Sequence, residues 1–237
     1  MPSRRTLKLA LAAALAAALL AIPAYAAPAS DNAGMTPEQV AELYLRLALR
    51  NDVEAGKRLN DYLKPAFDGK EALNIEYLAT VPGLMRPMFE EYADTLLKSL
   101  PKVDPTRAKP AIVAAMLAQH AAVASADCRA LSREERANDA VAGQRIATVA
   151  YRCKVLAIDQ SIEQLLANEE DDPDKVTTEL LVENFERYRR AHETAADTRE
   201  VDGVINLYGG NGQPWVTGSY AEVIDVVTDG MLKKSAE

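Results

Sequence analysis

The sequence is poor in the side chains that most often carry catalysis or hold metals: its 237 residues include two histidines, two cysteines and one tryptophan. His120 is expected at a helix end, and His192 on the apolar stripe of a helix, where it is a core residue. His192-Glu193 begins like the zinc motif H-E-x-x-H, but the fifth position is Ala196, so the second histidine is missing. The sequence therefore predicts no catalytic residue, no metal site and no cofactor site.

Two loop-like segments also lack what a binding loop requires. The acidic run Glu169-Glu170-Asp171-Asp172 has no glycine and is followed by Pro173, whereas a calcium loop turns around a central glycine. Gly209-Gly210-Asn211-Gly212 lies between two expected strands, so it indicates a hairpin turn and not a phosphate loop. Few aromatic residues are present to line a sugar cleft. Trp215 is either a core anchor, which its place at a strand start favours, or an exposed contact residue.

The first 26 residues have the pattern of a secretory signal peptide. Three basic residues lie within residues 1–8, an uncharged Leu/Ala run covers residues 9–22, and Ala24-Tyr25-Ala26 offers small residues to a signal peptidase. The apolar run is shorter than the roughly 20 residues that span a bilayer. We therefore expect cleavage between Ala26 and Ala27, a periplasmic or secreted location, and no stable membrane anchor after cleavage.

Three other interpretations of this segment are less favoured. An uncleaved anchor does not explain the small residues at the exit. A twin-arginine signal is weakened by Lys8, which stands where that motif has an apolar residue. A lipoprotein is excluded because acylation needs a cysteine at the cleavage point, and Ala27 stands there.

Basic residues are scarce relative to acidic ones. Without residues 1–26, which contain three basic and no acidic residues, 24 basic residues face 35 acidic ones, giving a net charge of −11. Nucleic-acid binding depends on Lys and Arg neutralising phosphates, so this balance argues against nucleic acid and against anionic lipid surfaces. A basic protein partner is allowed, although an acidic surface also serves solubility alone.

The only two cysteines, Cys128 and Cys153, predict one disulfide, because an even count in an exported chain is typical of an oxidised pair. Val123–Ser132 and Gln144–Leu156 have strand-like composition. If they pair antiparallel with the two cysteines opposite each other, the turn falls within residues 138–143, where Asn, Asp and Gly occur. The predicted disulfide and the predicted hairpin therefore support each other.

Helix signals dominate the first half of the remaining chain. Thr36, Pro37 and Gln39 form a complete helix start with a capping box, and Asp52 is placed to cap a second helix. Further helices are expected over residues 70–80, where Val81-Pro82-Gly83 ends the helix, and then up to Leu100 and over 105–120. Later segments suggest helices over Asp159–Asn168, after Pro173 along Leu181, Phe185, Tyr188 and His192, and after a Ser219–Glu222 capping box.

Residues 201–208 and 214–217 indicate a second hairpin. The expected fold is therefore α+β, in which a helical N-terminal half packs on a small antiparallel sheet of two hairpins, one of them disulfide-bonded, with a C-terminal helix. The expected organisation is a flexible leader over residues 27–34 and a single domain over residues 35–235.

Residues 36–45, Thr-Pro-Glu-Gln-Val-Ala-Glu-Leu-Tyr-Leu, and residues 51–55, Asn-Asp-Val-Glu-Ala, resemble the first two helices of nuclear-transport-factor-two-like (cone-fold) domains. This resemblance implies helices laid across a curved antiparallel sheet with a pocket, in families that include ligand binders and a few isomerases and cyclases. The chain departs from that pattern through a helical insertion over residues 70–120 and a final helix, and no functional residue is transferred.

These observations lead to three hypotheses. The first is an exported, non-enzymatic binding protein that engages a protein partner, for example an inhibitor or immunity protein acting against a basic exported toxin in the periplasm. The alternative is a cone-fold small-ligand pocket protein or enzyme, which requires an apolar cavity of several hundred cubic ångströms. A third, a structural envelope component, has no feature for or against it.

Overall fold

A computed structural model describes residues 34–159, 161–162 and 175–233. The predicted signal peptide, the leader up to residue 33, the acidic run before Pro173 and most of the expected helix over Asp159–Asn168 lie outside the described residues.

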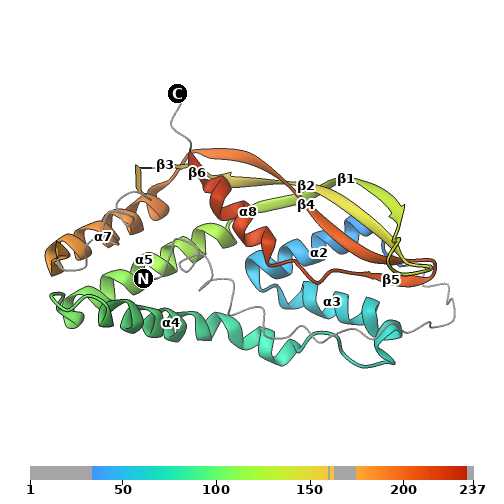
Figure 1. Ribbon diagram of the computed structural model, residues 1–237, viewed down its shortest axis with the longest axis horizontal. Coiled ribbons are helices and arrows are strands. Elements are labelled where there is room, and N and C mark those ends of the chain that lie inside the picture. The colour runs from blue at the N-terminus through green and yellow to red at the C-terminus, as the bar shows by residue number, and fades with distance from the viewer. Residues whose placement is uncertain (1–33, 160, 163–174, 234–237) are drawn as a thin grey trace.

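The described residues form the α+β fold that the sequence predicts (Figure 1). The helices are α2 (Pro37–Arg50), α3 (Val53–Leu63), α4 (Ile75–Lys98), α5 (Pro105–Ala124), α7 (Thr178–Thr194) and α8 (Glu222–Met231), with a 3-10 helix, η2 (Lys64–Phe67), after α3. One antiparallel sheet has the order β1-β2-β4-β5 and contains β1 (Asp127–Ala137), β2 (Arg145–Leu156), β4 (Thr198–Gly210) and β5 (Gln213–Val216). A short parallel pair, β3 (Ile158–Asp159) and β6 (Leu232–Lys233), was not expected from the sequence.

The two predicted hairpins are joined into one sheet because β2 and β4 pair along their length, from Arg145 opposite Gly209 to Leu156 opposite Thr198. Helices α2, α3 and α8 lie against one face of this sheet, while α7 and the adjoining parts of α4 and α5 lie beyond its end (Figure 1).

The starts of the first two helices confirm the sequence prediction. Thr36 Oγ1 accepts a hydrogen bond from the Gln39 backbone N–H, and the Gln39 side chain accepts one from the Thr36 N–H. Asp52 caps α3 by accepting from the Ala55 N–H at 2.9 Å, and it also pairs with Arg46. Burial raises the pKa of Asp52, but these hydrogen bonds and the Arg46 charge outweigh it and hold the pKa below its ordinary value.

The predicted break at Val81-Pro82-Gly83 is wrong, because α4 runs without interruption from Ile75 to Lys98 and contains both Pro82 and Pro87. Each proline removes one backbone donor from the helix. Both prolines are exposed, whereas Leu78 and Phe89 on either side of them are buried against the rest of the molecule. Burial of the apolar side of α4 therefore outweighs the local preference for a break.

Other boundaries differ from the prediction as well. The helix expected from residue 70 begins only at Ile75, where the Asn74 side chain caps it by accepting from the Tyr77 N–H. Val123 belongs to the last turn of α5 rather than to a strand, since its buried side chain packs in the core cluster near the sheet. The Ser219–Glu222 capping box does not form, and α8 begins at Glu222 without a side-chain cap. Instead, the Ser219 N–H donates to Thr217 Oγ1, and Tyr220 stacks on Tyr44 with ring centroids 5.8 Å apart.

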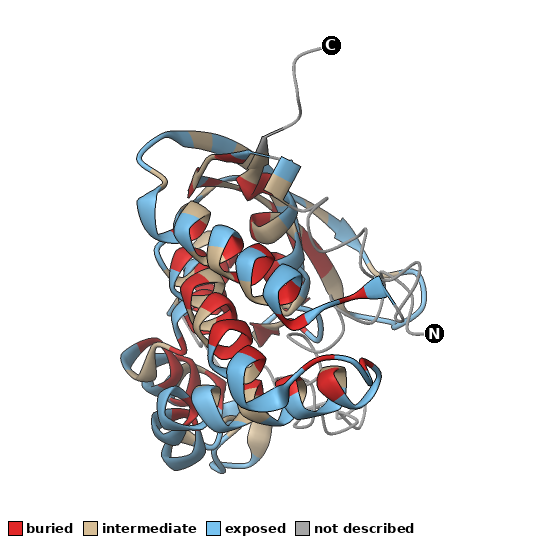
Figure 2. Ribbon diagram, turned by 90° about the vertical axis from the view of Figure 1, so that its left-hand side faces the viewer, coloured by how far each residue is buried: buried red, intermediate tan, exposed pale blue. Residues whose placement is uncertain are grey.

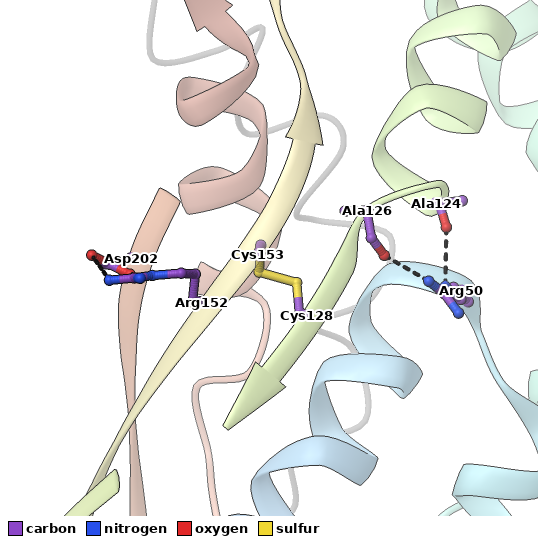
Figure 3. The surroundings of a disulfide bond; sticks show 7 residues. All are labelled: Arg50, Ala124, Ala126, Cys128, Arg152, Cys153 and Asp202. Atoms are coloured by element: carbon purple, nitrogen blue, oxygen red, sulfur yellow. Dashed lines mark hydrogen bonds and ion pairs between the residues drawn. A yellow bond between two sulfur atoms is a disulfide. The ribbon is translucent and has the colours of Figure 1, made fainter. Parts of the chain in front are cut away.

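The disulfide hairpin is confirmed in its predicted register (Figure 3). Cys128 lies directly opposite Cys153, and the two are bonded with their Cα atoms 3.9 Å apart. The turn over residues 138–143 is closed by a hydrogen bond from the Asn138 N–H to the Gln144 carbonyl. Beside it, the Arg50 guanidinium donates to the carbonyl oxygens of Ala124 and Ala126, which ties the end of α2 to the junction of α5 and β1.

Two apolar clusters fill the interior, and Figure 2 shows the buried residues along the inward faces of the helices. The first lies between the sheet and α2, α3 and α8, around Leu45, Leu59 and Tyr151. The second lies among α4, α5 and α7, around Ile112 and Phe185. The helical half therefore packs on the sheet through α2 and α3, whereas α5 lies between α4 and α7 and packs with both.

Candidate functional site

Among the described residues, helices cover one face of the sheet and no helix covers the other. Alternate residues of β2 that point toward the helices, such as Val149, Tyr151 and Val155, are at most 2% exposed. The intervening residues point the other way, as the strand period of two requires. We call this second surface the open face; it comprises Asp127, Arg129, Ser132, Glu134 and Arg136 of β1, Ile146, Thr148, Ala150, Arg152 and Lys154 of β2, and Glu200, Asp202, Val204, Asn206 and Tyr208 of β4.

Apolar side chains lie at the centre of the open face. Ala150 is opposite Val204, and Ile146 is opposite Tyr208. Val204 is 59% exposed and Tyr208 is 36% exposed, whereas Ile146 is only 7% exposed. Between these two pairs, the Thr148 hydroxyl donates to Asn206 at 2.8 Å. We call Ala150, Val204 and Tyr208 the apolar strip; its two accessible large side chains, Val204 and Tyr208, lie on either side of this polar pair.

Charged side chains of both signs border this strip. Arg152 pairs with Asp202 at 2.6 Å (Figure 3). It also pairs with Glu200 at 3.2 Å. The hydrogen bond from Arg152 holds the pKa of the Asp202 carboxyl below its ordinary value. The open face is thus balanced in charge rather than acidic. A clear acidic stripe lies instead on α8, whose exposed side carries Glu222, Asp225 and Asp229 while the helix contains no basic residue.

A cavity lies where the two apolar clusters meet, and we call it the helix-junction cavity. Its volume is about 40 Å³. It is lined by Ala48, Leu49 and Asn51 of α2 and its C-cap, Tyr77, Val81, Leu84, Met85, Met88 and Phe89 of α4, His120 and Val123 of α5, and Ile224 of α8. Half of these residues come from the segment of α4 that contains the two prolines. The cavity is much smaller than the several hundred cubic ångströms that the small-ligand hypothesis requires, and helices rather than the sheet line it.

The two histidines lie on different helices, His120 on α5 and His192 on α7, and each has its own contacts. His120 lies within α5, one turn before its end, and meets the Phe89 ring edge-on with centroids 6.3 Å apart, so it caps no helix end. His192 is 6% exposed, as a core histidine should be, and its Nδ1 lies 2.9 Å from the Tyr188 carbonyl oxygen. Burial lowers the pKa of both side chains.

The remaining predicted site residues are in structural positions. Trp215 is 8% exposed, which confirms it as a core anchor, and its backbone N–H donates to the Tyr62 hydroxyl at 2.8 Å. Gly210, Asn211 and Gly212 all have positive φ in the β4–β5 turn, as expected for a hairpin.

In the described part of the chain, no group of three or more His, Cys, Asp or Glu side chains is placed to hold a metal ion. None of the described helices combines the length and the apolar character needed to cross a membrane.

Comparison with known proteins leaves the family open. The chain matches no protein-family model and no curated protein. Among solved structures it is similar to a proposed lipoprotein, ycdA, from Bacillus subtilis, with 13% sequence identity and a TM-score of 0.32. The match covers 84% of this chain and 60% of the ycdA chain. A TM-score this low carries no argument about fold or function, and the resemblance to cone-fold domains stays a prediction.

The sequence did not reveal the helix-junction cavity. Its lining residues are drawn from helices that are distant in the chain, so no local pattern marks them. The one local signal is Asn51, a polar residue directly after the apolar helix that ends at Arg50.

Proposed function

We propose that this protein is an exported, non-enzymatic binding protein that engages a protein partner through the open face. The observation that carries the proposal is the accessible apolar strip at the centre of that face, bordered by charged side chains. Protein interfaces have this composition, with an apolar centre and a polar rim. The Cys128–Cys153 disulfide supports an extracytoplasmic location, because such bonds persist in oxidising compartments.

The partner is expected to be basic. The full chain has a net charge of −8, and loss of residues 1–26 would make it −11. Such a charge accelerates encounter with an oppositely charged protein, and salt weakens this effect. The acidic stripe on α8 adds to the negative electrostatic potential that attracts a basic partner, although it lies on the covered side of the sheet. The open face supplies the apolar contact. Inhibition of a basic exported toxin is one form that this function would take.

The test compares the wild-type protein with Val204→Arg in capture of proteins from a cell-envelope extract at low salt. A partner bound through the open face should lose affinity by at least about tenfold, because arginine removes the apolar contact and repels a basic surface. The captured protein should also be released as salt is raised.

Leu180→Arg provides the matched control. Leu180 lies on α7, away from the sheet, and is 44% exposed, so the same substitution there changes charge equally. The proposal is contradicted if wild type captures no protein at low salt, or if Val204→Arg and Leu180→Arg retain the same proteins equally well. Thermal unfolding of both variants shows that they are folded.

A further inference from the structure

The helix-junction cavity contains a buried acceptor that the protein itself does not satisfy. Asn51 is 7% exposed and lines the cavity, and its Oδ1 accepts no hydrogen bond from the described residues. A buried polar group without a partner is costly, and native proteins retain few of them.

The helix end does not explain the choice of this residue. Asn51 ends α2 with φ of 49° and ψ of 42°, in the left-handed region. Glycine adopts this conformation without strain and is the commonest residue at such a position. Glycine would end the helix equally well and would bury no unpaired oxygen. We therefore expect the side-chain amide at position 51 to accept a hydrogen bond from a bound molecule.

The rest of the lining is apolar and can adjust. No Asp, Glu, Lys or Arg lines the cavity, and most of its wall is aliphatic or aromatic. Met85 and Met88 supply flexible side chains that adapt to the shape of a ligand. Pro82 and Pro87 remove two backbone donors from the part of α4 that covers the cavity, so this segment is held by fewer hydrogen bonds than a regular helix.

We infer that the helix-junction cavity binds a small, uncharged, largely apolar molecule of about three or four non-hydrogen atoms, which donates a hydrogen bond to Oδ1 of Asn51. A buried water takes up about 10–15 Å³ of such space, so the volume of about 40 Å³ accommodates roughly three water-sized groups, whereas a cavity that holds an aromatic ring measures about 150 Å³. A charged ligand is excluded because its charge would be buried without a counter-ion. Burial lowers the pKa of His120 and favours its neutral form, so the wall beside Asn51 is also uncharged near neutral pH.

This site is independent of the open face and of the proposed protein partner. It lies among α2, α4, α5 and α8, whereas the open face is on the other side of the sheet. A protein that fails to bind a partner through Val204 can still bind a ligand at Asn51, and the reverse also holds.

2-Propanol and acetone are the probes, because they have nearly the same shape and only 2-propanol carries a hydroxyl donor. Their binding to the full chain is measured by ligand-observed NMR titration. Wild type should bind 2-propanol saturably, and Asn51→Gly should weaken 2-propanol binding relative to acetone by about fivefold, the effect of one lost hydrogen bond. Glycine at position 51 keeps the left-handed conformation, so the variant should fold.

Asn211→Gly is the matched control, since Asn211 also has a left-handed backbone, with φ of 53°, but lies exposed in the β4–β5 turn. It should leave the binding of both probes unchanged. Ala48→Leu should weaken both, because Ala48 is 3% exposed and a larger side chain would fill the cavity. The inference is overturned if wild type binds no 2-propanol, or if Asn51→Gly and Asn211→Gly bind 2-propanol with equal affinity.

Discussion

Replacing both Cys128 and Cys153 with alanine is expected to lower the free energy of unfolding by about 3–4 kcal/mol. The bond joins residues that are 25 positions apart, and closing a loop of that size restricts the unfolded chain by about this amount in the chain-entropy model. Cys153 is fully buried, so lost packing adds to the effect. Denaturant titration of the wild type and the double variant measures the difference.

Reduction of the wild type provides a control that changes no residue. A reductant should shift the unfolding midpoint of the wild type toward that of the double variant and should leave the double variant unchanged. Equal stability of the oxidised wild type and the double variant would mean that the disulfide contributes nothing to the fold, contrary to this account.

The second large effect is expected at the contact between Tyr151 and Gly203, which face each other across β2 and β4. Tyr151 is 1% exposed, and its ring lies over Gly203, where a Cβ atom would overlap ring atoms. Tyr151→Ala should cost about 3–5 kcal/mol through the cavity it leaves. Gly203→Ala should cost about 1–3 kcal/mol through overpacking.

The double variant tests whether these two effects share one contact. Removing the ring also removes the overlap, so the combined loss should be smaller than the sum of the two single losses. Gly218→Ala is the control, because a Cβ at that position meets no atom within 4 Å and should change stability little. Strict additivity of the Tyr151 and Gly203 losses in denaturant titration would contradict the assigned packing.

Local signals made part of the fold predictable. Thr36 and Asp52 define helix starts through atoms only a few residues away, so the sequence contains the whole interaction. The hairpin was predictable because Cys128 and Cys153 fix both the partner strand and the register. The general α+β class followed from these elements.

Features that depend on contacts between distant segments were not predictable in the same way. The helix over residues 75–98 continues through Pro82 because its neighbours Leu78 and Phe89 are buried, and the sequence alone does not show that burial. Ser219 fails as a cap because Thr217 and Tyr44 set the path of the chain before α8.

The same distinction between local patterns and distant contacts applies to the two candidate sites. Alternation along β4 is a local pattern, so the outward direction of Val204 follows once the strand is assigned. That none of the described helices covers this face is a property of the topology, which no local pattern contains. The helix-junction cavity depends on four helices that meet only in the folded protein, and Asn51 acquires its significance only there.

Intact mass spectrometry of the protein isolated from the extracytoplasmic fraction of its own cells tests the proposed export and oxidation most directly, with thiol labelling before and after reduction. The account predicts a chain that begins at Ala27, takes up no label before reduction, and takes up two labels afterwards. A full-length chain recovered from the cytoplasm with both cysteines labelled at once would contradict it.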